Sequence, residues 1–386
     1  MKVTASAFSP LRPDAEQIDR RLRQILKRDS ANVGVDAQMD RLTVMLTRSC
    51  ELRCSYCFVA VREDAYGRDS DGAKLAGIPT GDIGHERLGA AIDLLMRSPR
   101  PRLGLQLFGG EPTRRWDLLA AGIERARCHP ERRGRSLELL VTTNGLGLDP
   151  DDPSLDERLA VLAASEIVVE LSIDGDARAS RFRRGHLVTT DASNARLARL
   201  IGRLNSSGVR WFANATLPPA AAGELSERYE WARASEVPAL QLNYATGMAW
   251  TDEQRTTYLE GMQRVLVRDH LERTKLSLFN WNNGADPVPL CADVMVDVDG
   301  TIVQMGGIFH EKRFPELRNA YHRGTLAGTR SFEGLRIPLG DLFELTRRTL
   351  SASDWAVFES NTRLGAGVDL VVALTRRRLG IGVSSA

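Results

Sequence analysis

The chain of 386 residues has few cysteines, little net charge and no long apolar run. Its five cysteines include a group of three, which does not suit a disulfide framework and favours a reducing cytoplasm. No apolar stretch approaches the roughly 18 residues that span a bilayer, and the first residues lack the apolar core of a signal peptide. The 52 basic and 50 acidic residues give a net charge of +2, without the basic excess typical of nucleic-acid binding. We therefore expect a soluble cytoplasmic protein that binds neither nucleic acid nor membrane.

Three of the cysteines lie within eight residues, as Cys50, Cys54 and Cys57, with the spacing C-x3-C-x2-C. Thiolates are soft ligands that favour iron–sulfur clusters, zinc or copper. Zinc would need a fourth ligand, and no histidine or second C-x2-C pair lies nearby. A chance grouping of structural cysteines is the remaining alternative. The spacing favours a [4Fe–4S] cluster with one iron left open to a ligand that is not part of the protein.

Short apolar runs alternate with helical patterns after this loop begins. The runs suit buried strands of a parallel sheet and lie at 42–46, 103–108, 137–142, 167–173, 209–216 and 239–244. Segments 88–95 and 197–204 have apolar residues at the spacing i, i+3, i+4, i+7 of an amphipathic helix. Six strand–helix units are too few for an eight-stranded barrel, so they predict an α/β fold with an open, partial (β/α)6 TIM-like barrel.

The two ends of the chain differ from this pattern. Residues 14–27 predict a helix within a charged N-terminal stretch, and residues 294–303 predict a β-hairpin with an Asp-Gly turn. A final helical region covers roughly residues 340–378. We therefore predict an N-terminal helical extension at 1–40, a barrel at 41–250 and an extension of hairpin and helices at 251–386.

Polar groups follow the predicted strands. Gly-Gly-Glu-Pro lies at 109–112, Thr-Thr-Asn-Gly at 142–145 and Ser-Ile-Asp-Gly at 172–175. Two glycines let a backbone approach a ligand closely, and a carboxylate beside them can accept hydrogen bonds from an ammonium group. Each motif alone is also an ordinary turn signal. Because the carboxyl ends of barrel strands carry binding and catalytic groups, the cysteine loop followed by these three motifs predicts one site.

With the aromatic Tyr56 before its last cysteine, the loop resembles the C-x3-C-x-aromatic-C hallmark of the radical S-adenosylmethionine (SAM) superfamily. The resemblance implies a partial (β/α)6 barrel, one [4Fe–4S] cluster on the three cysteines, and SAM chelating the open iron through its amino and carboxylate groups. One electron from the cluster would cleave SAM to methionine and a 5′-deoxyadenosyl radical, which abstracts a substrate hydrogen. An external one-electron reductant of the flavodoxin or ferredoxin type would supply that electron.

The strand-end motifs resemble the SAM site of this family. The resemblance implies that Glu111 binds the SAM amine and that Asn144 and Ser172 contact SAM. Asp174 would contact SAM or face the substrate, and an arginine would lie near the SAM carboxylate. Asn214, at the end of the fifth strand, would touch SAM or substrate, or be satisfied by backbone. The residues expected to bind the cofactor are Tyr56, Gly109, Gly110, Glu111, Asn144, Ser172, Asp174, Arg183, Arg184 and Asn214.

The Ser-Ile-Asp-Gly run and the C-terminal extension resemble the branch of the superfamily whose members carry a SPASM or twitch domain. There the extension opens with a cysteine, a hairpin and Gly-x4-Cys, and its cysteines bind auxiliary clusters. Here the hairpin begins at Cys291, but Met305 stands at the second cysteine position and no cysteine follows. An auxiliary cluster needs about four thiolates, and Cys128 lies in a predicted helix-to-loop region. We expect the hairpin scaffold without its cluster, with Cys291 a buried small residue or a substrate-facing thiol.

The resemblance leads to three functional hypotheses. The first is an enzyme that modifies a ribosomally synthesised peptide by crosslinking, epimerisation, oxidation or cleavage. Residues 1–40 are too short for an independent peptide-binding domain, which weakens it. The second is an enzyme acting on a small metabolite, such as an aminosugar, a nucleoside or an amino acid. The third, a non-enzymatic scaffold that carries a cluster, is disfavoured because all four elements of the SAM site are present.

Overall fold

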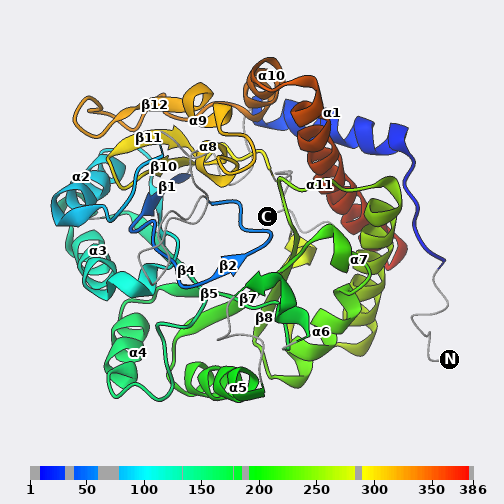
Figure 1. The fold of residues 1–386 in the computed structure, drawn as a ribbon, viewed down its shortest axis with the longest axis horizontal. Coiled ribbons are helices and arrows are strands. Elements are labelled where there is room, and N and C mark those ends of the chain that lie inside the picture. The colour runs from blue at the N-terminus through cyan, green and yellow to red at the C-terminus, as the bar shows by residue number, and fades with distance from the viewer. Residues whose placement is uncertain are drawn as a thin grey trace.

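The protein folds around a single ten-stranded sheet that curves into an open barrel. The computed structural model describes residues 9–30, 39–59, 78–132, 134–176, 178–184, 191–282 and 289–381. The strands follow the order β12-β11-β10-β1-β3-β4-β5-β7-β8-β9. Helices surround the curved sheet on its outer side (Figure 1). The predicted α/β partial barrel is therefore confirmed.

Six neighbouring parallel strands form the barrel. They are β1 (Met39–Met45), β3 (Arg102–Phe108), β4 (Ser136–Thr143), β5 (Val168–Ser172), β7 (Arg210–Leu217) and β8 (Ala239–Tyr244). Each overlaps one of the predicted apolar runs. Leu42, Leu105 and Val169 are nearly fully buried on these strands. The short apolar runs thus identify the strands because a sheet covered by helices buries most of its side chains.

The helices between the strands bury the stripes that the sequence predicted. Those around the barrel are α2 (Gly84–Met96), α3 (Trp116–Cys128), α4 (Leu155–Ala164), α5 (Asp191–Ser206), α6 (Leu225–Ala234) and α7 (Asp252–Glu272). Leu88, Ala91, Ile92 and Leu95 of α2 are all buried, as the spacing i, i+3, i+4, i+7 requires. Short 3-10 turns lie at η4 (Pro112–Arg115), η5 (Pro130–Arg132), η6 (Ala179–Phe182), η8 (Pro219–Ala221) and η9 (Phe279–Asn282).

The C-terminal part of the chain extends the barrel sheet on both sides. Strand β9 (Ser277–Leu278) pairs in parallel with β8, and β10 (Val294–Val296) pairs in parallel with β1. Strands β11 (Thr301–Gln304) and β12 (His322–Thr325) complete an antiparallel edge. The predicted hairpin is therefore present as β10 and β11, with Gly300 at a φ of +86° in its turn. The division into three domains stays a prediction, because the sheet runs from the barrel into the extension without a break.

The N-terminal helix packs against the C-terminal helices. Helix α1 (Ala15–Ser30) contacts α10 (Leu339–Thr349) and α11 (Ala352–Arg378), and the three lie side by side in Figure 1. Arg363 of α11 donates to Asp19 of α1 at 2.8 Å. Helices α8 (Gly306–Phe309) and α9 (Glu316–Ala320) lie between the hairpin and this layer. Within the described part of the chain, no helix is both long and apolar enough to cross a membrane.

Candidate active site

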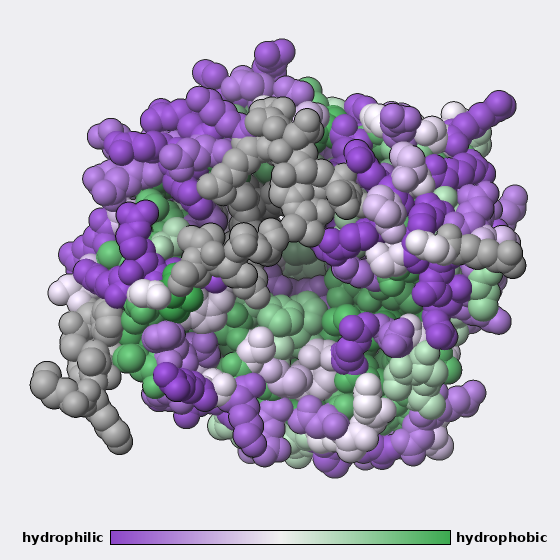
Figure 2. Space-filling view, turned by 180° about the vertical axis from the view of Figure 1, so that it is seen from behind, coloured by the Kyte–Doolittle hydropathy of each residue, from purple (hydrophilic) through white to green (hydrophobic). Residues whose placement is uncertain are grey.

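A cavity of about 650 Å³ lies at the carboxyl end of the barrel strands and extends into the barrel. Its walls come from the cysteine loop (residues 46–58), the ends of the barrel strands, and the segment after β11. In the space-filling view, apolar side chains border a hollow at the centre of the molecule (Figure 2). The tertiary structure thus gathers the predicted strand-end motifs around one concave site.

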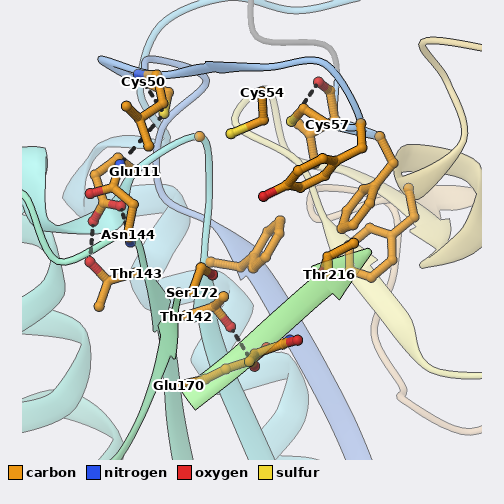
Figure 3. A pocket seen from close by; sticks show the side chains of 18 of the residues that line it. Cys50, Cys54, Cys57, Glu111, Thr142, Thr143, Asn144, Glu170, Ser172 and Thr216 are labelled. Atoms are coloured by element: carbon orange, nitrogen blue, oxygen red, sulfur yellow. Dashed lines mark hydrogen bonds between the residues drawn. The ribbon is translucent and has the colours of Figure 1, made fainter. Parts of the chain in front are cut away.

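The three clustered cysteines line the same cavity. Cys50 is buried, Cys54 and Cys57 are half-buried, and none of the three forms a disulfide bond with another described cysteine. Figure 3 shows them side by side above the strand ends. No three cysteine, histidine or carboxylate side chains among the described residues are grouped closely enough to hold one metal ion. Three thiols on one short loop are a donor set that suits an iron–sulfur cluster.

Burial makes the bare thiolates unfavourable at this site. It raises the pKa of Cys50 well above the usual range for a thiol. Burial, followed by the neighbouring Cys54, raises the pKa of Cys57 to about 12. A bound metal removes this penalty, because its positive charge deprotonates a coordinating thiol. The donor set and its burial therefore fit an iron–sulfur cluster.

The glycines of the Gly-Gly-Glu-Pro motif allow the cysteine loop to approach the end of β3. The Gly110 amide donates to the Thr47 carbonyl at 2.8 Å, and the Glu111 amide donates to the Ser49 carbonyl at 2.9 Å. A Cβ atom added to Gly110 would lie 2.5 Å from the Ser49 carbonyl oxygen. Close approach of backbone to backbone thus explains this glycine, whereas its predicted contact with SAM stays a prediction.

The Glu111 side chain is a buried acceptor that joins the ends of β3 and β4. Its Oε1 accepts hydrogen bonds from the Thr113 amide, the Thr113 hydroxyl and the Thr143 hydroxyl. Its Oε2 accepts from the Asn144 amide at 2.7 Å. Only 1% of the residue is exposed. The carboxylate thus holds the Thr143–Asn144 turn in place, and its predicted contact with the SAM amine remains a prediction.

Glu111→Gln should lower the free energy of unfolding by about 1–3 kcal/mol, because the glutamine amide group would face donors where a carboxylate oxygen now accepts. Urea unfolding of the wild type and the variant in the same metallation state measures the difference. The matched control is Glu227→Gln on the exposed side of α6, with an expected change of less than about 0.5 kcal/mol. Equal effects of the two substitutions would contradict the structural role of Glu111.

Other predicted residues meet at the same cavity. The Tyr56 hydroxyl donates to Asp174, which joins the cysteine loop to the end of β5. Asp174 also accepts from the Thr216 amide at 3.3 Å. The side-chain Nδ2 of Asn144 lies 3.9 Å from the Cys50 sulfur, and Ser172 lines the cavity. The predicted SAM contacts of these residues stay predictions.

Arg183 and Arg184 form the short strand β6 (Arg183–Arg184). This strand pairs antiparallel with β2 (Arg53–Cys54) of the cysteine loop, with Cys54 opposite Arg183. Their backbone therefore supports the loop that carries the cysteines. Their side chains lie outside the described residues, so an interaction with the SAM carboxylate stays a prediction.

A row of polar side chains lies deeper in the barrel, and sequence reasoning missed two of its members, Gln106 and Glu170. Gln106, Thr142, Glu170 and Asn243 line the cavity beside the predicted Asn214. The Asn214 side chain donates to Glu170 and accepts from Asn243. The alternation of a strand offered a signal, because side chains two residues apart share one face. Thr142 and Glu170 each lie two residues before a predicted SAM contact.

Three buried charged side chains and the half-buried Arg318 hold the cysteine loop against the C-terminal hairpin. Arg48, two residues before Cys50, donates to Asp297 at 3.0 Å and also to Glu311. Arg318 contacts both of these carboxylates, at 2.6 and 3.1 Å. Burial works to lower the pKa of Arg48, but Glu311 and Asp297 raise it overall. Arg48 therefore stays positively charged. The network also borders the cavity, because Phe309 and Lys312, close to Glu311 in the sequence, line it.

Three comparisons with known proteins bear on the chain. No protein-family model matches it. A stretch of 127 residues is 35% identical to GTP 3′,8-cyclase of Paenarthrobacter nicotinovorans, and it covers 31% of this chain and 30% of that relative. The chain thus spans less than a third of this curated relative.

Solved structures match over nearly the whole chain. Histidine-tagged anSMEcpe with bound AdoMet (SAM) has a TM-score of 0.65 at 14% identity, covering 90% of this chain and 96% of that one. Native anSMEcpe with bound AdoMet and the Kp18Cys peptide has a TM-score of 0.63 at 12% identity, covering 88% and 99%. At these identities the comparison shows that the fold is shared.

Proposed function

We propose that the chain is a radical SAM enzyme, since it has the fold of the radical SAM superfamily. The observation that carries the proposal is the set of three cysteines on one loop that line a single cavity. When bound, a [4Fe–4S] cluster and SAM would supply a 5′-deoxyadenosyl radical that abstracts a hydrogen atom from the substrate. An external one-electron reductant of the flavodoxin or ferredoxin type would supply the electron that cleaves SAM.

The residues of the chain would hold these cofactors in the cavity. Cys50, Cys54 and Cys57 would bind the cluster, with Cys50 buried and Cys54 and Cys57 half-buried in the cavity wall. The hydrogen bond from Tyr56 to Asp174 positions the loop over the end of β5. Gly109, Gly110, Asn144 and Ser172 line the same wall, which supports their predicted contacts with SAM.

The positions of the two remaining cysteines favour a single cluster in the protein. Cys128 is exposed at the end of α3, and Cys291 is half-buried before β10, where it packs against the barrel core. Neither belongs to the cavity wall. Because an auxiliary cluster needs about four thiolates, we propose that the hairpin extension carries none.

We propose a ribosomally synthesised peptide as the substrate. The fold shared with anSMEcpe, whose structures include complexes with the Kp18Cys and Cp18Cys peptides, supports this choice. A small metabolite is the second candidate, because the partial match to GTP 3′,8-cyclase links part of the chain to an enzyme named for a nucleotide. A gene for a short precursor peptide beside this one would favour the first, and neighbouring genes of sugar or antibiotic biosynthesis would favour the second.

Anaerobic reconstitution with iron and sulfide tests the proposal. We expect about four iron atoms per chain and, after reduction with dithionite, conversion of SAM to methionine and 5′-deoxyadenosine. Iron analysis and liquid chromatography measure the two outcomes. About eight iron atoms per chain would contradict the single cluster. A chain that binds about four irons but forms no 5′-deoxyadenosine would contradict the enzymatic function.

A further inference from the structure

Glu170 of β5 is a carboxyl group deep in the barrel whose remaining exposed surface faces the cavity. It lies two residues before Ser172 on the same face of the strand, and therefore about 6–7 Å further from the strand end. Figure 3 shows the cysteines at one end of the site and Glu170 at the other, with Ser172 between them. A ligand in this cavity would therefore meet Glu170 beyond the proposed SAM contacts.

Hydrogen bonds converge on Glu170 from both sides of the barrel. On one side Gln106 donates to the Thr142 hydroxyl at 2.9 Å, which donates to Glu170 Oε2 at 2.9 Å. On the other side Asn243 donates to Asn214 at 2.9 Å, and Asn214 donates to Glu170 Oε1. Each of these two series of hydrogen bonds ends with a donor that points at the carboxylate of Glu170. The row is therefore oriented to hold Glu170 as an acceptor, with acceptor sites left over on both oxygens.

No described residue forms an ion pair with Glu170. Burial raises its pKa above the usual range, while the bonds from Asn214 and Thr142 act in the opposite direction. The described cations in the cavity wall are Arg53 of the cysteine loop and Lys312 of the segment after α8, and neither contacts Glu170. A buried carboxylate without a cation is unfavourable, so a positively charged ligand group would gain a charge-assisted hydrogen bond there.

We propose that the substrate presents a cationic nitrogen group, a primary ammonium or a guanidinium, to Glu170 at the inner end of the cavity. The proposal deepens the proposed function and rests on it, because it concerns the substrate of the same site. The group pairs with Glu170 while the atom that loses hydrogen lies nearer the cysteine loop. A lysine or arginine side chain of a peptide and the amine of an aminosugar share this chemistry.

Calorimetric titration of the reconstituted, SAM-bound enzyme with n-butylamine and with n-butanol tests the proposal. We expect the wild type to bind the ammonium roughly 10-fold or more tightly than the alcohol, the factor for a hydrogen bond to a charged group. Glu170→Gln, which keeps the size and one acceptor but not the charge, should remove this preference. The matched control Glu227→Gln, on the exposed side of α6, should retain it.

Equal binding of amine and alcohol by the wild type would overturn the proposal, as would an unchanged preference in Glu170→Gln. The wild-type comparison needs no variant, so it decides the question even if Glu170→Gln does not fold. Nα-acetyl-lysine methylamide and glucosamine then distinguish the two sources of the cation. Tighter, Glu170-dependent binding of either one supports the proposal and assigns the source, and no Glu170 dependence for both overturns it.

The two proposals fail separately. Formation of 5′-deoxyadenosine by the wild type without preference for the amine would overturn only the cationic substrate. A loaded chain that forms no 5′-deoxyadenosine would contradict the proposed function itself.

Discussion

Each of the substitutions Cys50→Ala, Cys54→Ala and Cys57→Ala should reduce SAM cleavage below detection. Two remaining thiolates do not hold a [4Fe–4S] cluster that must also leave one iron open, so the expected loss includes most of the iron. Each variant is reconstituted anaerobically beside the wild type. Iron per chain and 5′-deoxyadenosine formed after reduction are the measured quantities.

Cys128→Ala and Cys291→Ala are the matched controls, because they make the same change away from the cavity wall. We expect both to keep about four irons per chain and to cleave SAM at a rate within about two-fold of the wild type. SAM cleavage by Cys50→Ala would refute the radical SAM assignment. Loss of iron from Cys291→Ala would instead refute the single cluster.

Arg48→Met should lower the free energy of unfolding by about 3–5 kcal/mol, the range for removing one partner from a buried ion pair. The substitution leaves the carboxylates of Asp297 and Glu311 buried together, with Arg318 as their single cation among the described residues. The variant should also retain less iron, because Arg48 lies two residues before Cys50. Urea unfolding of the cluster-free chains under reducing conditions gives the stability difference.

Two further variants show whether the buried charges cause the effect. Arg102→Met removes an exposed arginine that pairs with Glu138 at 2.8 Å, and should cost less than about 1 kcal/mol. The double variant Arg48→Met with Asp297→Asn leaves Arg318 with Glu311, so it should be more stable than Arg48→Met alone. A loss in Arg48→Met no larger than that in Arg102→Met would contradict the buried network.

The barrel was predictable because its signals are local. Each strand is a short apolar run, and the stripe from Leu88 to Leu95 lies on one helix, so neighbours in sequence carry the pattern. The pairing of β10 with β1 was not predictable, because the two strands lie far apart in the chain. The hairpin was expected from its Asp-Gly turn, but not its place at the edge of the barrel sheet.

Among the site residues, the strand-end groups were predictable and the groups below them were not. Asn144 and Asp174 follow apolar runs and precede glycine, which is a local signal. Glu170 lies within such a run, where a carboxylate is unexpected, and its meaning depends on Thr142 and Asn214 from neighbouring strands. The sequence likewise did not reveal the four hydrogen bonds that Glu111 accepts, because they come partly from the end of β4.

The spacing of Cys50, Cys54 and Cys57 was enough to predict an iron–sulfur ligand set, because one loop carries all the thiols and their chemistry is intrinsic to sulfur. What surrounds that loop was decided by the folded chain. Arg48 meets Asp297 across 249 residues of sequence, and the polar row around Glu170 draws on strands that become neighbours when the barrel forms. Hydrogen bonds and ion pairs act over a few ångströms, so no pattern of neighbouring residues reveals partners that the fold brings together.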